Sequence, residues 1–220
     1  MNFDKTGSYI SAEGYTTGYY KDLSIHNLRN LCLLHNHTPP TPDGNYLELG
    51  FGQGLSIVAH AKMSSAQIFG CDLYPSHVLN AQNLADDMQA QVTLWNKSFS
   101  EVLQSKTIPN VDYIVAHGVW SWVGDEIKHQ ICAIIERCLN PGGVFYCSFN
   151  NFAGWAPLIP IQQFMRHYIA WRKLDVYREP ARFGEVIDAL ETLLQSNNAL
   201  SQDERVVRHV KSLRKRDKSY

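Results

Sequence analysis

The residues of this chain best suited to chemistry lie in one short stretch, residues 47–54, which reads Leu-Glu-Leu-Gly-Phe-Gly-Gln-Gly. It begins as an apolar strand with one acidic residue and continues as three alternating glycines. A strand that runs through a glycine loop into a helix brings bare backbone up to a nucleotide-like ligand. A diphosphate needs positive potential at such a loop, whereas the carboxylate of Glu48 repels phosphate and attracts an ammonium group. The loop therefore predicts a nucleoside ligand that carries an ammonium group instead of phosphate.

The spacing of the glycines separates two cofactors that contain a nucleoside. The NAD fingerprint is Gly-x-Gly-x-x-Gly. In this chain the third glycine, Gly54, comes one residue early, and Leu55 stands where that fingerprint needs a small residue. S-adenosylmethionine carries an α-ammonium and a sulfonium but no phosphate, which suits Glu48. The loop favours S-adenosylmethionine, and thus methyl transfer, over an NAD-linked oxidoreductase.

A second acidic residue, Asp72, follows an apolar run about twenty positions after the loop. At the tip of the neighbouring strand its carboxylate can accept hydrogen bonds from both hydroxyls of a ribose. The alternative is an acidic residue at a helix N-terminus, but Ser76 is the better candidate for that cap. We therefore expect Asp72 to bind ribose, which NAD and S-adenosylmethionine both contain.

Two further strand ends carry candidate site residues. After the third strand, Ser98 and Phe99 can meet the adenine, although Phe99 suits a core position equally well. After the fourth strand, His117 lies where the sulfonium is expected, and the alternative is a buried core histidine. Trp120 and Trp122 follow, and aromatic faces attract a sulfonium and exclude water. We expect one of these two tryptophans to serve packing instead.

Apolar periodicity predicts the elements that position these residues. We expect strands over 46–49, 66–72, 91–96, 111–117 and 143–149, and helices over 54–63, 76–89, 99–104 and 125–139. This alternation predicts an α/β fold with a doubly wound, Rossmann-like, mostly parallel sheet. Three helices follow, over 157–172, 180–195 and 201–218. The expected domains are an N-terminal Tyr/Gly-rich segment and helix (1–44), a cofactor-binding core (45–155) and a helical C-terminal extension (156–220).

Three motifs together resemble class I S-adenosylmethionine-dependent methyltransferases: the loop over 47–54, Gly-Cys-Asp over 70–72, and Leu-Asn-Pro-Gly-Gly over 139–143. The stretches over 114–123 and 146–155 resemble bacterial methyltransferases with a C-terminal methyltransferase regulatory domain, a group that includes protein lysine methyltransferases. The resemblance implies S-adenosyl-L-methionine as cofactor. The cofactor-binding residues it implies are Glu48, Gly50, Phe51, Gly52, Gly54, Asp72, Leu73, Ser98, Phe99, His117 and Gly118.

The chain departs from that family pattern in three places. Phe51 stands where a small residue is usual, and either crowds the loop or wedges it in place. A Gly/Tyr-rich segment over 14–20 replaces a proline-rich entry. The antiparallel strand pair that normally completes the sheet is not evident, which predicts either a truncated chain or a minimal five-stranded core.

Methyl transfer from a sulfonium is an in-line displacement that depends mainly on alignment and desolvation. An acceptor lysine must be neutral to attack, and an apolar aromatic pocket lowers its pKa. The expected substrate pocket comprises Tyr15, Tyr19, Tyr20, Trp120, Trp122, Asn150 and Trp155. Tyr19 and Tyr20 are candidates for a lid, and His117, Trp120 and Tyr20 for catalytic residues. The acceptor is a protein or a small molecule, and the alternative function is a non-catalytic cofactor-binding module.

Bulk composition narrows the class of protein. The net charge is −1 over 220 residues, so nothing global indicates a nucleic-acid or membrane partner and we expect neither, and no apolar run is long enough to span a bilayer. The five cysteines show no Cys-x-x-Cys spacing and read as reduced, which predicts a cytoplasmic protein. No metal-ligand constellation is evident. The basic segment over 201–218 is either a docking face for an acidic partner or, as we prefer, a solvated helix. The C-terminal helices are also candidates for contacts in an oligomer.

Overall fold

The computed structural model describes residues 17–176 and 179–215. The chain divides into two compact units, Met1–Phe149 and Asn150–Tyr220, which are described separately below. The predicted three-part division at residues 44 and 155 remains a prediction. Across the described residues, we find no helix with the length and apolar character that a membrane crossing requires.

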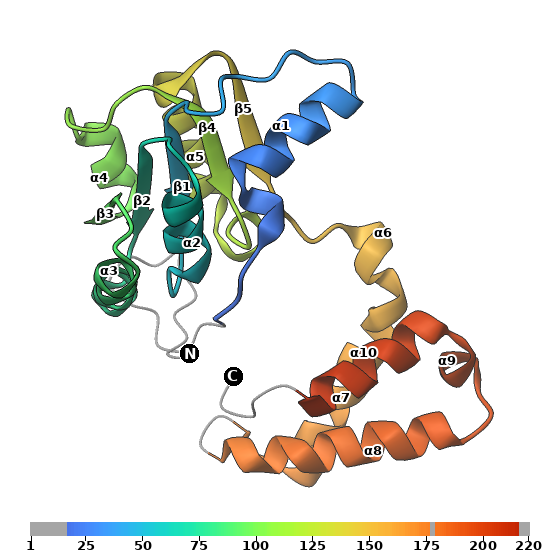
Figure 1. The fold of residues 1–220 in the computed structure, drawn as a ribbon. Coiled ribbons are helices and arrows are strands. Elements are labelled where there is room, and N and C mark those ends of the chain that lie inside the picture. The colour runs from blue at the N-terminus through green and yellow to red at the C-terminus, as the bar shows by residue number, and fades with distance from the viewer. Residues whose placement is uncertain (1–16, 177–178, 216–220) are drawn as a thin grey trace. The chain divides into compact units, whose positions relative to one another are not determined.

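A five-stranded parallel sheet forms the centre of the first unit (Figure 1). The strand order is β3-β2-β1-β4-β5, and every neighbouring pair is parallel. The strands are β1 (Tyr46–Leu49), β2 (Ile68–Asp72), β3 (Val92–Asn96), β4 (Val111–Ala116) and β5 (Leu139–Cys147). This arrangement confirms the predicted doubly wound α/β sheet, and no further strand occurs among the described residues.

The largest difference from the predicted strand boundaries is at the start of β5. β5 begins at Leu139 rather than at residue 143 and includes Pro141, whereas we expected this segment to end the preceding helix. Pro141 is tolerated because β5 is an edge strand, where one missing N–H donor leaves no partner unsatisfied. The pairing of β4 with β5 is irregular between Val111 and Tyr113, which absorbs the extra residues.

Helices cover both faces of the sheet. The helical elements of this unit are η1 (Lys21–Leu23), α1 (Ile25–Leu34), α2 (Leu55–Met63), α3 (Pro75–Met88), α4 (Phe99–Gln104), η2 (Trp120–Trp122) and α5 (Asp125–Cys138). Buried residues of α1, α2 and α3 pack in one cluster with Tyr46 and Tyr113, and those of α4 and α5 pack in another with Leu47 and Ile114. Alternate residues of β1 and β4 thus face opposite layers, as the period of a strand requires.

The helix starts follow local capping rules, with one correction. Ser24 caps α1, and Ser98 with Glu101 forms a capping box at α4. The expectation that Ser76 caps α3 was wrong: the N-cap is Tyr74, and Pro75 occupies the first turn. Proline suits that position because it has no N–H to satisfy and its φ is already helical.

The second unit is helical over its described residues. It contains α6 (Phe152–Trp155), η3 (Ala156–Leu158), α7 (Ile159–Arg172), η4 (Pro180–Arg182), α8 (Phe183–Gln195), α9 (Ala199–Gln202) and α10 (Glu204–Lys215). Ile161, Leu190, Val206 and Val210 form its buried core. The predicted helical C-terminal region is confirmed, although the last expected helix is broken at Asp203 into α9 and α10.

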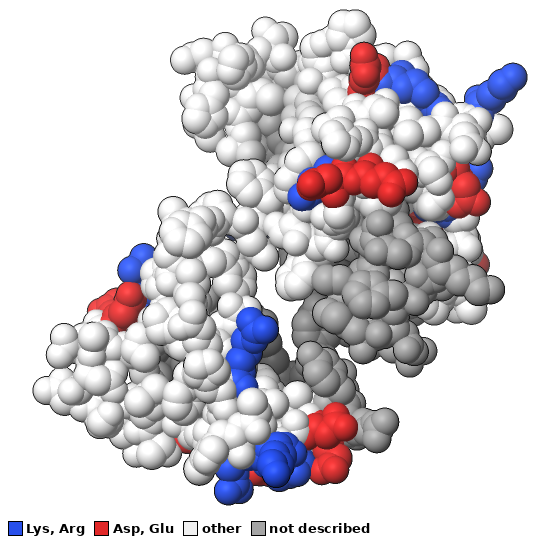
Figure 2. All heavy atoms as spheres, turned by 180° about the vertical axis from the view of Figure 1, so that it is seen from behind, with Lys and Arg blue, Asp and Glu red and all other residues white. Residues whose placement is uncertain are grey.

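The basic residues of α10 are partly neutralised by acidic neighbours. Arg205 pairs with Asp203, and Arg214 pairs with Asp188 and Glu191 of α8. Figure 2 shows blue and red side chains next to one another at this end of the chain. Because Val206 and Val210 of the same helix are buried, the charged side is the solvated face of an amphipathic helix.

Candidate functional site

The glycine loop lies between β1 and α2, and its glycines are required by its backbone. Gly50, Gly52 and Gly54 have φ angles of 74°, 59° and 85°, a region that other residues rarely adopt. A Cβ on Gly50 would lie 2.8 Å from Cγ2 of Val119, and one on Gly54 would lie 2.2 Å from Cβ of Ala81. The loop therefore approaches α3 and the segment between β4 and η2 more closely than a side chain would allow.

Phe51 acts as a wedge under this loop. It is 7% exposed and belongs to the core cluster of α2 and α3. Its ring packs on the backbone of Gly70 in β2, where an added Cβ would lie 2.8 Å from Phe51 Cδ1. The large residue at this position thus points into the core and is accommodated by a glycine on the neighbouring strand.

The loop separates two hollows at the carboxyl ends of the strands. The first, here called the β1 hollow, lies over Glu48 and is lined by Gly18, Tyr20, Glu48, Gly50, Phe51, Gln53, Gly54, Leu55, Ser56 and His117. The second, the β2 hollow, lies over Asp72 and is lined by Gly50, Gly52, Asp72, Leu73, Tyr74, His77, Lys97, Ser98, Phe99, Gly118, Val119, Trp122 and Val123. In parallel sheets ligands bind at this edge, where the strand order reverses beside β1.

Glu48 is a buried acid beneath the β1 hollow. It is 3% exposed, and the hydroxyl of Tyr46 donates a hydrogen bond to its Oε2 at 3.1 Å. Burial raises the pKa of Glu48 to about 7, and the nearby charge of Asp72 contributes in the same direction. A carboxyl group in this setting gains from a cationic ligand, because a positive charge replaces the hydration that burial has removed.

A short strap, Gly18 to Tyr20, covers the β1 hollow. The Ser56 hydroxyl accepts a hydrogen bond from the Tyr20 N–H at 2.8 Å and donates one to the Gly18 carbonyl at 3.1 Å. The Tyr20 ring lies 4.3 Å from the ring of His117, and Tyr19 meets His60 edge-on at 5.5 Å. The volume left in the hollow is about 20 Å³, enough for a single water molecule.

Two histidines beneath the strap have unusual environments. Both ring nitrogens of His60 and Nδ1 of His117 are buried without a hydrogen-bond partner among the described residues. Burial lowers the pKa of His60 to about 4 and also lowers the pKa of His117. Both imidazoles are therefore neutral near pH 7, and Nδ1 of His117 is able to accept a proton.

The β2 hollow is larger, with a volume of about 110 Å³. Leu73, Phe99 and Gly118, all predicted site residues, line it. Phe99 also belongs to the core cluster of α4 and α5, so it both lines the hollow and packs in the core, while contact with an adenine stays a prediction. Ser98 lines the hollow too, but its hydroxyl is engaged with Glu101 in the capping box.

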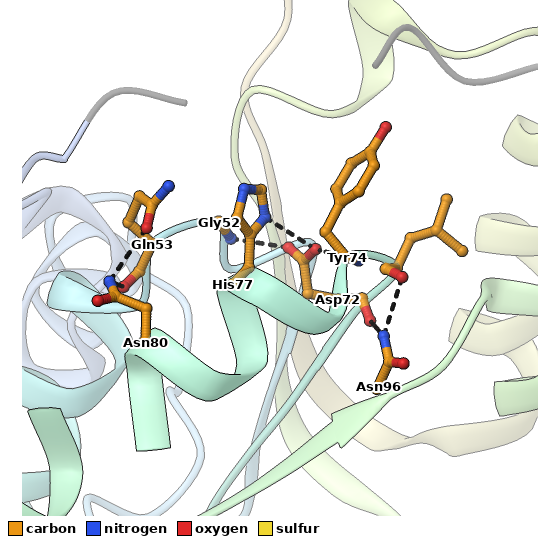
Figure 3. A network of polar contacts seen from close by, with 8 residues as sticks. Gly52, Gln53, Asp72, Tyr74, His77, Asn80 and Asn96 are labelled. Carbon is orange, nitrogen blue, oxygen red and sulfur yellow. Dashed lines mark hydrogen bonds and ion pairs between the residues drawn. The ribbon is translucent and has the colours of Figure 1, made fainter. Parts of the chain in front are cut away.

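Asp72 lies at the centre of a polar network on one wall of the β2 hollow (Figure 3). Its Oδ2 accepts from the Gly52 N–H at 2.8 Å, and its Oδ1 accepts from the Tyr74 N–H at 3.0 Å. Nδ1 of His77 also lies 3.0 Å from Oδ1. One carboxylate thus fixes the glycine loop and the start of α3 relative to each other.

The remaining predicted pocket residues are dispersed. Trp122 lines the β2 hollow, whereas Trp120 lines neither hollow and packs against the core cluster of α4 and α5. Asn150 and Trp155 belong to the second unit, where Trp155 meets His209 edge-on. Tyr15 lies outside the described residues.

Sequence reasoning missed four residues that shape the site. Ser56 and His77 are polar and lie only two and five positions after predicted site residues, which was a usable signal in the sequence, and the structure buries both. Tyr46 bonds Glu48 from the same face of β1, as a spacing of two in a strand allows. The hydroxyl of Ser148 accepts from the Gly118 N–H at 2.8 Å, a contact across 30 positions that no local pattern announces.

Residues 47–143 match a protein-family model described as a methyltransferase domain. The doubly wound sheet and the strand-end loop agree with this similarity to a methyltransferase domain. The predicted resemblance to class I methyltransferases is thereby confirmed.

Relatives extend the similarity over nearly the whole chain. An uncharacterized protein of Synechocystis sp. is 29% identical over 96% of this chain and 42% of its own length. The structure of PKMT2 from Rickettsia typhi in complex with AdoHcy matches with a TM-score of 0.75 and 23% identity, over 94% of this chain and 39% of that one. An S-adenosylmethionine-dependent methyltransferase from Clostridium acetobutylicum matches with a TM-score of 0.50 and 18% identity, over 64% and 54%. The chain thus spans about two fifths of the length of the first two relatives.

Proposed function

We propose that this chain is an S-adenosylmethionine-dependent methyltransferase that methylates an amine, either a protein lysine or a small molecule. The observation that carries the proposal is the pair of buried carboxyl groups, Glu48 and Asp72, on the two sides of one glycine loop. An ammonium group and a ribose are the ligands that two such groups suit. Similarity to a structure in complex with AdoHcy, the product that S-adenosylmethionine leaves, supports the same cofactor.

The residues of the two hollows fit this cofactor. Glu48 would hold the ammonium group in the β1 hollow, and Asp72 the ribose in the β2 hollow. Leu73, Phe99 and Val119 supply apolar surface for the adenine. Gly50 lines both hollows and has no side chain that would reduce the space between them. When bound, the cofactor supplies a methyl group activated by a sulfonium.

We assign the strap and His117 to the acceptor. The rings of Tyr20 and His117 exclude water from the end of the β1 hollow, and a desolvated amine is neutral more readily than a solvated one. Nδ1 of His117 is buried and has no partner within the described part of the chain, so it can take a proton from the amine. Because burial lowers the pKa of His117, the imidazole is in its basic form at neutral pH.

Transfer of a radiolabelled methyl group from S-adenosylmethionine tests the proposal. Lysine-containing peptides and small amines serve as alternative acceptors, and label in either supports the function. His117→Ala should lower kcat about 100-fold while it changes the affinity for S-adenosylhomocysteine less than about threefold. His129→Ala, at an exposed position of α5, is the matched control. Binding of the cofactor without transfer to any acceptor would favour a non-catalytic module.

A further inference from the structure

Most acceptor positions of the Asp72 carboxylate are already occupied by the protein itself. A carboxylate has about four lone-pair positions, two on each oxygen. Oδ1 interacts with the Tyr74 N–H and with Nδ1 of His77, and Oδ2 with the Gly52 N–H, as the dashed lines in Figure 3 show. Three positions are filled by described residues, and the fourth is on Oδ2.

These contacts are buried and therefore persistent. Asp72 is 6% exposed and His77 is 7% exposed. Loss of a partner in such a place leaves a desolvated donor unsatisfied, which is unfavourable. Opposite a carboxylate oxygen, Nδ1 of His77 is assigned as the donor.

Of the three donors, His77 is the one that belongs to a side chain. The N–H groups of Gly52 and Tyr74 come with the backbone of the glycine loop and of the turn before α3, whatever the sequence. His77 projects from the first turn of α3 (Pro75–Met88) and lines the β2 hollow together with Asp72. Its presence decides whether Oδ1 keeps an acceptor position for a ligand.

We propose that His77 sets the ribose recognition of this site, because it saturates Oδ1 and leaves Asp72 able to accept a hydrogen bond from only one ribose hydroxyl. The inference rests on the proposed function, since it takes an adenosyl cofactor as the ligand. It differs from the sequence-based expectation that Asp72 binds both hydroxyls. His77 is a positioning residue in this account, because it acts on the ribose through Asp72.

Calorimetric titration of the whole chain with three ligands tests the proposal: S-adenosylhomocysteine, its 2′-deoxy analogue and its 3′-deoxy analogue. We expect one analogue to bind at least tenfold more weakly than S-adenosylhomocysteine, as loss of a hydrogen bond to a charged acceptor predicts. The other analogue should bind within about twofold. Equal, large losses for both analogues would overturn the proposal, because they would mean that Asp72 accepts from both hydroxyls.

Variants assign the effect to His77. In His77→Leu, Oδ1 regains an acceptor position, so both analogues should bind more weakly than the parent ligand. His77→Asn keeps an N–H donor at nearly the same place and should retain the one-sided selectivity. Asn80→Ala is the matched control, because Asn80 also joins α3 to the glycine loop, through Gln53, but does not touch Asp72.

Different outcomes test the role of His77 and the proposed cofactor. His77→Leu with unchanged selectivity would contradict the role of His77. Altered selectivity in Asn80→Ala would contradict it as well. Loss of any hydrogen bond between α3 and the glycine loop would then be enough to change the selectivity. Failure of the unmodified chain to bind S-adenosylhomocysteine would instead refute the proposed cofactor.

Discussion

At the residue scale, Glu48 is a buried carboxyl group whose environment shifts its pKa close to neutral pH. Its neighbours are the hydroxyl of Tyr46 and, across the glycine loop, the carboxylate of Asp72. Burial raises its pKa to about 7, so near neutral pH the group is half ionised in the absence of a ligand. Only the ionised form attracts an ammonium group, and cofactor binding should therefore depend on pH.

The affinity for S-adenosylmethionine should rise as the pH increases from 6 to 7.5. With a pKa of about 7, the ionised fraction of Glu48 increases roughly eightfold over this interval, and the association constant should increase in proportion. Calorimetry in buffers of different ionisation enthalpy should show one proton released at pH 6. Glu48→Gln should bind weakly and without this slope. An equal slope in that variant would assign the proton to another group.

At the scale of elements, the glycine loop is a contact between the start of α2 and the middle of α3. Gly54 is the N-cap of α2, and its α carbon lies against the methyl group of Ala81. Because both sides of this contact are backbone or Cβ, no flexible side chain can move aside. The distance between the two helices is thus set by the absence of one methyl group.

Gly54→Ala should destabilise the fold by about 3 kcal/mol or more, because it combines a positive φ with a clash. Gly142→Ala is the control: Gly142 has a φ of 79°, but an added Cβ there meets nothing within 4 Å. It should cost about 1–2 kcal/mol. Urea unfolding of both variants measures the difference. Equal losses would mean that α2 and α3 separate easily.

The strap is the second element whose position bears on function. Because it leaves room for about one water molecule in the β1 hollow, it must lift before a ligand enters. Ser56→Ala removes both hydrogen bonds that hold it, each worth about 1 kcal/mol. Stopped-flow fluorescence should show association of S-adenosylhomocysteine about tenfold faster in this variant. Ser65→Ala, exposed beyond the end of α2, should not change the rate; an unchanged rate in Ser56→Ala would contradict the strap as a gate.

Much at this scale could be predicted from the sequence, and the rest depended on distant contacts. The alternation of apolar runs predicted all five strands and the edge at which the site lies, because those signals are local. The role of Phe51 was not predictable, since it depends on Gly70, on another strand. The number of donors around Asp72 likewise depends on where α3 begins, which is at Pro75 and not after Ser76. The packing of Trp120 against the core could not be predicted from the spacing of residues in the sequence.

At the scale of the whole molecule, two buried groups act on stability in opposite directions. The pKa of Glu48 is raised to about 7, so its contribution is fully present below its unfolded value of 4.5 and is lost as the pH rises through 7. The pKa of His60 is lowered to about 4, so its contribution is present above 6.5 and is lost as the pH falls toward 4. Between pH 5 and 7.5 the two effects, each about 2 kcal/mol, nearly cancel.

Single variants should reveal the two opposing effects of pH on stability. His60→Leu removes the histidine term, so this variant should become more stable at pH 5 than at pH 7.5, by about 2 kcal/mol. Glu48→Gln should instead be more stable at pH 7.5 than at pH 5, by a similar amount. The free energy of unfolding in urea at the two pH values measures both. If the free energy of unfolding changed with pH equally in the original chain and in His60→Leu, His60 would titrate normally in the folded protein.

We propose above that the two hollows together form one site for S-adenosylmethionine. Titration calorimetry of the chain with S-adenosylhomocysteine and, separately, with NAD tests it most directly. S-adenosylhomocysteine should bind with one-to-one stoichiometry, Asp72→Asn should weaken this binding, and NAD should give no heat of binding. Binding of NAD without binding of S-adenosylhomocysteine would contradict the account, because the carboxyl group of Glu48 should exclude a diphosphate from this loop.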